Sequence, residues 1–334
     1  MSTNQISQEI SNNRSFLMGI AMLSIMLFHQ GWIYGWNPFF AFFHFFGNWG
    51  VDIFFFVSGF GCYYSLNKDG DIASFYKRRL LRMLPICIGC GLFRYLIDHT
   101  LPVGVGGYPT GVHEVSSDWM TILSWDRWFI PVIMVYYLLM PVLFCVIERY
   151  GNNILLGGYI LALLGALFVT PDWMIMYLIH VPSFCIGIIT AAGMFQSTTI
   201  NKLIGFFAIM IASIYKFVGM MGWFLIDDDF TYIILSFGIV VLCLSIIEIQ
   251  FTIRRYDLAW KFGKIIKGFL CFIGKHTLEI YLIHESVYRY IYRFLIETSV
   301  PLFVQMLIGM GVAVLIAIFF GKTTSSLVSA FVRK

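Results

Sequence analysis

The sequence predicts an all-α protein, a polytopic transmembrane bundle of about ten helices. Composition is the first indication: 59% of the 334 residues are hydrophobic and only 12% are charged, whereas a soluble domain has roughly 25% charged residues. The mean hydropathy is +0.82. Apolar runs long enough to cross a bilayer also recur along the whole chain. We therefore expect a lipid bilayer around the protein and no nucleic acid as partner.

The apolar runs give the predicted spans, and the loop charges orient them. Basic residues gather after the second and eighth spans, so the positive-inside rule places both termini in the cytoplasm of a plasma-membrane protein. We treat 1–334 as a single membrane domain, with a polar cytoplasmic segment at 1–15 and an extracytoplasmic loop at 99–126. The expected spans are 16–34, 41–65, 83–98, 128–147, 153–169, 173–194, 203–223, 230–250, 269–288 and 301–321.

Two ionisable residues in the first two spans are candidate catalytic groups. His29 lies thirteen residues beyond Phe16, which at 1.5 Å per residue places it about 20 Å along the helix axis, in the outer half of the bilayer. An imidazole at that depth suits a general base; the alternative is a histidine bonded to a neighbouring helix carbonyl. Asp52 begins the second span's apolar stretch at a similar level and would orient the His29 ring, or else cap the helix.

A basic segment precedes the third span. Arg78, Arg79 and Arg82 lie where the span meets water, and the last two fall three residues apart on one helical face. Guanidinium groups in this arrangement suit phosphate recognition. The alternative is that these arginines only set the topology.

Further polar residues are candidates for supporting roles. Ser58, Trp128 and Tyr281 are potential donors to an oxyanion, although Ser58 is also typical of helix packing. His284 lies in the ninth span and is a second intramembrane imidazole. Beside it, Glu285 and Arg289 have the spacing of an ion pair along one helix. No His, Cys and Asp set has the spacing of a metal site, so we expect no metal.

Five segments together resemble the acyltransferase-3 family of integral membrane acyltransferases. One departure concerns the first helix: the family usually has an arginine eleven residues before the histidine, where this chain has Met18, while Arg14 lies one helical turn earlier. The segments are Gly19 to His29, Gly50 to Phe60, Phe75 to Pro85 with Arg79 and Arg82 at the paired arginine positions, Trp128 to Pro141, and Ile273 to His284.

The resemblance implies transfer of an acyl group, most often acetyl, from cytoplasmic acyl-CoA to a hydroxyl of an extracytoplasmic or lipid-linked glycan such as a capsular polysaccharide. It implies that the arginine cluster holds the coenzyme A phosphates and that His29 acts as base or carries the acyl group. A homo-oligomer and a partner protein of the envelope both remain open. The alternative function is a transporter or exporter of a glycan or another polar solute, which also uses polar groups at mid-membrane.

Overall fold

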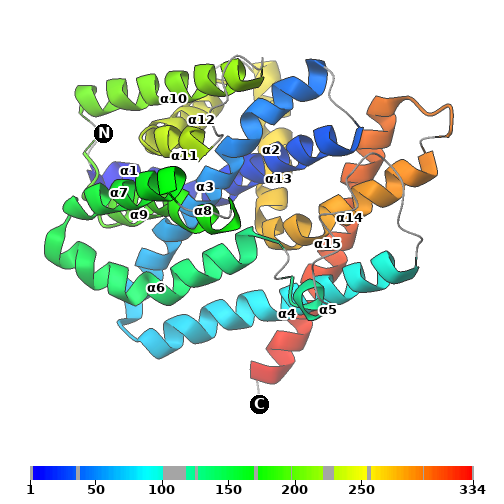
Figure 1. Cartoon of the computed structure of the whole chain (residues 1–334), viewed down its shortest axis with the longest axis horizontal. Coiled ribbons are helices and arrows are strands. Elements are labelled where there is room, and N and C mark those ends of the chain that lie inside the picture. Colours follow the sequence, from blue (N-terminus) through cyan, green and yellow to red (C-terminus); the bar gives the residue numbers. More distant parts are fainter. Residues whose placement is uncertain are drawn as a thin grey trace. The chain divides into compact units, whose positions relative to one another are not determined.

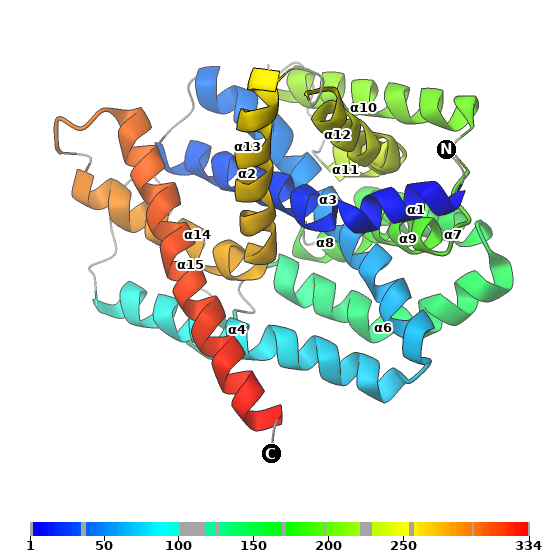
Figure 2. The same cartoon turned by 180° about the vertical axis from the view of Figure 1, so that it is seen from behind.

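The structure is a computed structural model that describes residues 3–34, 38–100, 118–124, 127–168, 172–196, 198–220, 229–253, 257–295 and 297–332. These ranges form helices and contain no strand, which confirms the all-α class (Figures 1 and 2). The helices are α1 (Thr3–Asn12), α2 (Arg14–Tyr34), α3 (Pro38–Asp69), α4 (Ile72–Thr100), α5 (Asp118–Ile122), α6 (Phe129–Tyr150), α7 (Asn153–Phe168), α8 (Asp172–Ile179), α9 (Val181–Ala191), α10 (Thr199–Met220), α11 (Asp229–Ser236), α12 (Ile239–Ile253), α13 (Asp257–Lys275), α14 (Thr277–Leu295) and α15 (Leu302–Val332).

Five of the described helices are long and apolar enough to cross a membrane. A sixth span results if Phe230–Ser236 and Ile239–Ile249, bent by 66°, count as one. The five are Ile72–Ile97, Phe129–Tyr150, Met174–Ala191, Thr199–Val218 and Leu302–Thr324. The total of ten spans remains a prediction.

Several sequence-based boundaries need correction. The ninth span is not continuous, because α13 ends at Lys275 and α14 begins at Thr277. The fifth, α7, has only 16 residues, about 24 Å of helix, which is shorter than a bilayer core of about 30 Å. Of the predicted outer loop, 101–117 and 125–126 lie outside the described residues. The polar N-terminal segment is helical as α1.

The chain forms two compact units, each assembled from segments that are distant in sequence. Unit 1 contains Met1–Ala21, Gly47–Phe75 and Val132–Lys275. Unit 2 contains Met22–Phe46, Tyr76–Pro131 and His276–Lys334. The assignment of the whole chain to a single membrane domain stays a prediction.

In unit 1, glycines let helix backbones touch. A Cβ on Gly59 of α3 would lie 2.1 Å from the Phe184 carbonyl oxygen of α9, and one on Gly187 of α9 would lie 2.1 Å from the Phe56 oxygen. Real Cβ atoms do not approach so closely, so only glycine fits at either position. The two helices are thereby held in direct contact.

In unit 2, α14 and α15 pack together and α15 crosses α4 (Figure 2). Phe320 of α15 contacts the Phe93 ring of α4, with ring centroids 5.2 Å apart. Nearer the start of α15, Gly309 lies against the Tyr288 ring of α14. Unit 2 therefore has its own helix packing around α14.

Candidate active site

Four charged or ionisable side chains from three separate parts of the chain meet in unit 2. We call them the His29 cluster: His29 of α2, His284 and Glu285 of α14, and Arg127, which precedes α6. His29 Nδ1 lies 2.7 Å from His284 Nε2, and His29 Nε2 lies 3.5 Å from Glu285 Oε1. Glu285 Oε2 accepts a hydrogen bond from Arg127. The imidazole of His29 therefore stands between a second imidazole and a carboxylate.

The partners of the two rings assign their protons. His284 Nδ1 lies 2.8 Å from the Ile280 carbonyl oxygen, and a carbonyl only accepts, so Nδ1 carries the hydrogen. Neutral His284 then has a lone pair at Nε2, which receives the hydrogen on His29 Nδ1. Neutral His29 in turn has its lone pair on Nε2. This is the nitrogen that a general base needs unprotonated.

Glu285 favours a proton at His29 Nε2. Arg127 binds one oxygen of the Glu285 carboxylate, and the other oxygen faces His29. The guanidinium therefore stabilises the negative charge, while the second oxygen can still interact with a proton on His29. An imidazolium formed at His29 would gain an adjacent counter-charge. The His29 and Glu285 side chains are 20% and 26% exposed, whereas His284 is fully buried. The His29 side chain is thus partly exposed, whereas the ring that supports it is buried.

Two predicted donors lie in the same unit. Tyr281 is one helical turn before His284, with ring centroids 6.0 Å apart, and its ring packs at a tilt against the Phe129 ring, 5.2 Å between centroids. Trp128 directly follows Arg127 and is half-buried. The structure therefore brings both into the part of unit 2 that holds the His29 cluster.

The described contacts of Asp52 lie within unit 1. Asp52 Oδ1 accepts hydrogen bonds from Ser183 Oγ at 2.8 Å and from His180 Nδ1 at 3.2 Å, and all three residues are fully buried. We call them the Asp52 cluster. The His180 ring stacks on Phe55 at 4.5 Å. The predicted role of Asp52 in orienting His29 stays a prediction, while His284 and Glu285 are the partners described for His29 within unit 2.

The other two predicted supporting residues also lie in unit 1. Ser58 is buried in α3, next to Gly59 at the contact with α9. Arg14, at the start of α2, lies against Gly61 of α3: a Cβ there would be 2.8 Å from its guanidinium. Arg14 therefore packs against α3 within unit 1.

The arginine segment is helical, as predicted. α4 starts after Gly70, which has φ 61°, and Asp71 accepts hydrogen bonds from the backbone of Ala73 and Ser74, which caps the helix. Arg78 and Arg82 are exposed and Arg79 is half-buried. Two exposed guanidinium groups, those of Arg78 and Arg82, thus lie at one end of α4.

The buried face of α4 continues from Arg79 into the unit. Met83, Cys87, Cys90 and Arg94 follow it at spacings of three or four residues and are buried, which is one face of a helix. Arg94 has no exposed surface at all. It lies fifteen residues, about 22 Å of helix, beyond Arg79.

The His29 cluster also has ligand types that bind metals. One atom from each of His29, His284 and Glu285 lies within 4.8 Å of the others, and two imidazoles with a carboxylate can bind zinc. However, the two rings are hydrogen-bonded to one another and Arg127 occupies one carboxylate oxygen. The same contacts can serve as a proton relay; the expectation of no metal stays a prediction.

Sequence reasoning missed four residues of the two clusters. Glu285 was expected to pair with Arg289 along its own helix; it does interact electrostatically with Arg289, and it also forms an ion pair with Arg127, 158 residues away. His180 and Ser183 were not considered. The available signal was each one's position: Glu285 adjoins His284, Arg127 adjoins Trp128, and His180 lies inside a predicted span, where an ionisable group indicates a special environment.

The family model described as an acyltransferase domain, that of the acyltransferase-3 family, matches residues 16–322. The chain belongs to the acyltransferase-3 family. Among the curated proteins and the solved structures, no match was found. This acyltransferase is a membrane protein, and the matched range contains all members of the His29 cluster and the arginines of α4.

Proposed function

We propose that the protein transfers an acetyl group from cytoplasmic acetyl-CoA to a hydroxyl of an extracytoplasmic or lipid-linked glycan, with His29 as general base. The observation that carries this proposal is the hydrogen-bond chain from the Ile280 carbonyl through His284 to His29, which leaves the lone pair on His29 Nε2 beside Glu285. Family membership supplies the acyl transfer; the donor, the acetyl group and the acceptor are our inference.

The proposed reaction uses this nitrogen twice. The acceptor hydroxyl gives its proton to His29 Nε2 while its oxygen attacks the thioester carbonyl. The tetrahedral intermediate collapses, the C–S bond breaks, and the imidazolium returns the proton to the coenzyme A sulfur. Glu285 stabilises the imidazolium in between. Tyr281 and Trp128 are the candidate donors to the oxyanion. The sequence-based alternative, an acyl group carried on His29, uses the same lone pair.

The donor site is proposed at the arginine end of α4. Arg78, Arg79 and Arg82 would bind the coenzyme A phosphates through charge-assisted hydrogen bonds. These arginines and the His29 cluster are all in unit 2. One unit thus provides both the phosphate-binding groups and the base.

Acetyl-CoA and the purified protein test the donor. We expect acetyl-CoA to raise the thermal unfolding temperature and to release free thiol, and both effects to be lost when Arg79 and Arg82 are replaced by Ala. Lys202→Ala is the control, because Lys202 is an exposed cation of α10 in unit 1. If the double variant and the parent bind acetyl-CoA equally well, Arg79 and Arg82 do not bind the coenzyme and only set the orientation of the protein in the membrane. No binding by the parent would favour the exporter.

A further inference from the structure

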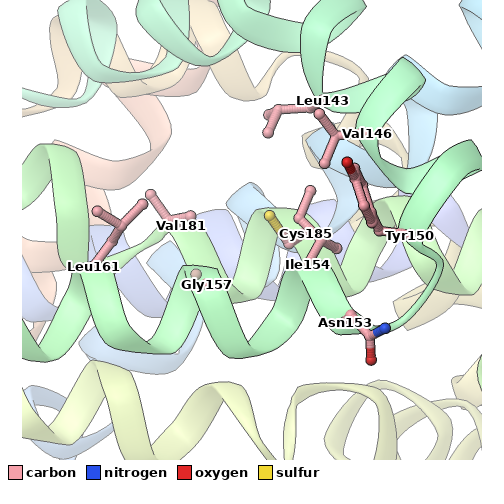
Figure 3. Close-up of a pocket in the computed structure, with 10 residues that line it drawn as sticks. Leu143, Val146, Tyr150, Asn153, Ile154, Gly157, Leu161, Val181 and Cys185 are labelled. Carbon is pink, nitrogen blue, oxygen red and sulfur yellow. The ribbon is translucent and has the colours of Figure 1, made fainter.

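A groove on unit 1 has the shape and polarity of a site for one lipid molecule. It encloses about 400 Å³, within the range of small-molecule sites, and lies among α6, α7 and α9 (Figure 3). We call it the α6–α9 groove. Its apolar part is formed by Leu143, Val146, Leu161, Val181 and Cys185. None of these residues belongs to the His29 cluster or to the Asp52 cluster.

The groove exists because α7 has glycine where a side chain would fill the space. A Cβ built on Gly157 meets no atom within 4 Å, whereas one on the adjacent Gly158 already touches Val181 at 3.4 Å. Gly158 therefore brings α7 against α9, and Gly157 leaves the hollow open beside that contact. Leu161, one turn further along α7, is 49% exposed.

The surroundings of the groove are hydrocarbon. α6 and the α8–α9 stretch Met174–Ala191 are both candidate membrane spans, and the large exposed side chains of α7 are apolar, most of them leucine. Inside a bilayer no hydrophobic force favours one apolar surface over another. A tail fills such a hollow because an unfilled one forfeits dispersion contacts. Selectivity for one kind of lipid must then come from polar groups at the end of the groove.

One end of the groove is polar and cationic. Tyr150 and Asn153 lie there, opposite the end marked by Leu161 and Val181 (Figure 3). Arg149 is exposed beside them, with its guanidinium 5.5 Å from the centre of the Tyr150 ring. Glu148, its neighbour in the chain, is exposed as well but is not among the residues that line the groove. A cation and two hydrogen-bonding groups at the mouth of an apolar slot match an anionic amphiphile.

We propose that the α6–α9 groove binds the acyl chain of an anionic phospholipid, with the headgroup phosphate at Arg149, Tyr150 and Asn153. Because Arg149 lies on the predicted cytoplasmic side, the lipid comes from the cytoplasmic leaflet. A lipid-linked glycan acceptor, whose headgroup faces outward, does not fit this orientation. The site is separate from the proposed reaction and does not depend on it.

Native mass spectrometry of the full chain tests the site with phosphatidylglycerol and phosphatidylcholine as probes. Gly157→Phe fills the groove and should lower phosphatidylglycerol occupancy about fivefold or more. Gly268→Phe is the matched control, because Gly268 is an exposed glycine of α13 whose Cβ would also meet no atom within 4 Å. Arg149→Gln should remove a preference for phosphatidylglycerol of about fivefold, the effect of one surface cation.

Two results would overturn the proposal. One is equal phosphatidylglycerol occupancy in Gly157→Phe and Gly268→Phe. The other is a dimer that only Gly157→Phe dissociates, because a second copy of the chain would then cover the groove. If Gly157→Phe does not fold, the surface variant Arg149→Gln decides: unchanged lipid preference in that variant also contradicts the site.

Discussion

The His29 cluster and the Asp52 cluster each place a carboxylate against a histidine inside apolar helices, but their surroundings differ. Glu285 has a cation, Arg127, on one side and a partly exposed imidazole on the other. Asp52 is bonded to a histidine and a serine, all fully buried. Its Oδ2 has no hydrogen-bond partner within the described part of the chain. A reaction needs access and a place for a proton, and only the first cluster has both.

From this comparison we propose that the first cluster carries the chemistry and that the second joins two helices. Asp52 lies on α3 and its partners at the start of α9, the two helices that Gly59 and Gly187 hold in contact. A buried carboxylate that joins two helices by hydrogen bonds needs no substrate to explain it. The predictions below test this division of roles.

The largest expected effect is that of His29→Gln. Loss of the base should lower acyl transfer by about 10³-fold, while acetyl-CoA still stabilises the protein, because no arginine of α4 is changed. Turnover by reconstituted protein and thermal unfolding with acetyl-CoA measure the two parts. Undiminished turnover would exclude His29 from the reaction.

Glu285→Gln should have the next largest effect. It keeps the shape of the side chain but removes the charge that stabilises the His29 imidazolium, so turnover should fall by about 10²-fold. Arg127→Gln should act on the same pathway, and the double variant should be no slower than the slower single one. Additive losses would show that Arg127 acts independently of Glu285.

Gly187→Ala should affect stability rather than turnover. Its new Cβ would lie 2.1 Å from the Phe56 carbonyl oxygen. The two helices would have to move apart, which should lower the free energy of unfolding by about 2–3 kcal/mol. Gly157→Ala is the control, because that Cβ meets open space. Thermal unfolding of detergent-solubilised protein compares the two; equal unfolding temperatures would mean that the α3–α9 contact is not tight.

The smallest effect is expected for Asp52→Ala. It leaves Ser183 and His180 without their acceptor and should destabilise the protein by about 1–3 kcal/mol. Asp52→Asn retains an acceptor oxygen and should destabilise less. Turnover per folded molecule should change less than for Glu285→Gln. A folded Asp52→Ala protein with no turnover would return Asp52 to the reaction and break the comparison.

Composition and local motifs predicted the helical class and the membrane location, because both depend on residues close together in the sequence. The shared helical face of Arg79 and Arg82 followed for the same reason, and the choice of His29 as base stays a prediction. The partners of His29 did not follow: His284 is 255 residues away, and helical periodicity does not say which helices meet. Asp52 and His29 were paired from their depth alone, and depth does not determine which neighbour a side chain faces.

The break at His276 escaped prediction because the apolar pattern continues through it. The ion pair expected between Glu285 and Arg289 was inferred from spacing on one helix. Arg127, from a distant segment, bonds to the same carboxylate. Both the break at His276 and the partners of Glu285 depend on contacts between distant segments, which local sequence patterns do not predict.

Each unit is interleaved in sequence, and this has a consequence for synthesis. His29 enters the bilayer 255 residues before His284 is made, a delay of roughly 10 to 50 seconds at bacterial and eukaryotic translation speeds. During that interval its imidazole must find water, lipid headgroups or a chaperone. A ribosome that stalls before α14 would release a membrane-inserted chain with no working relay, and cellular quality control could recognise that chain by its uncovered polar groups.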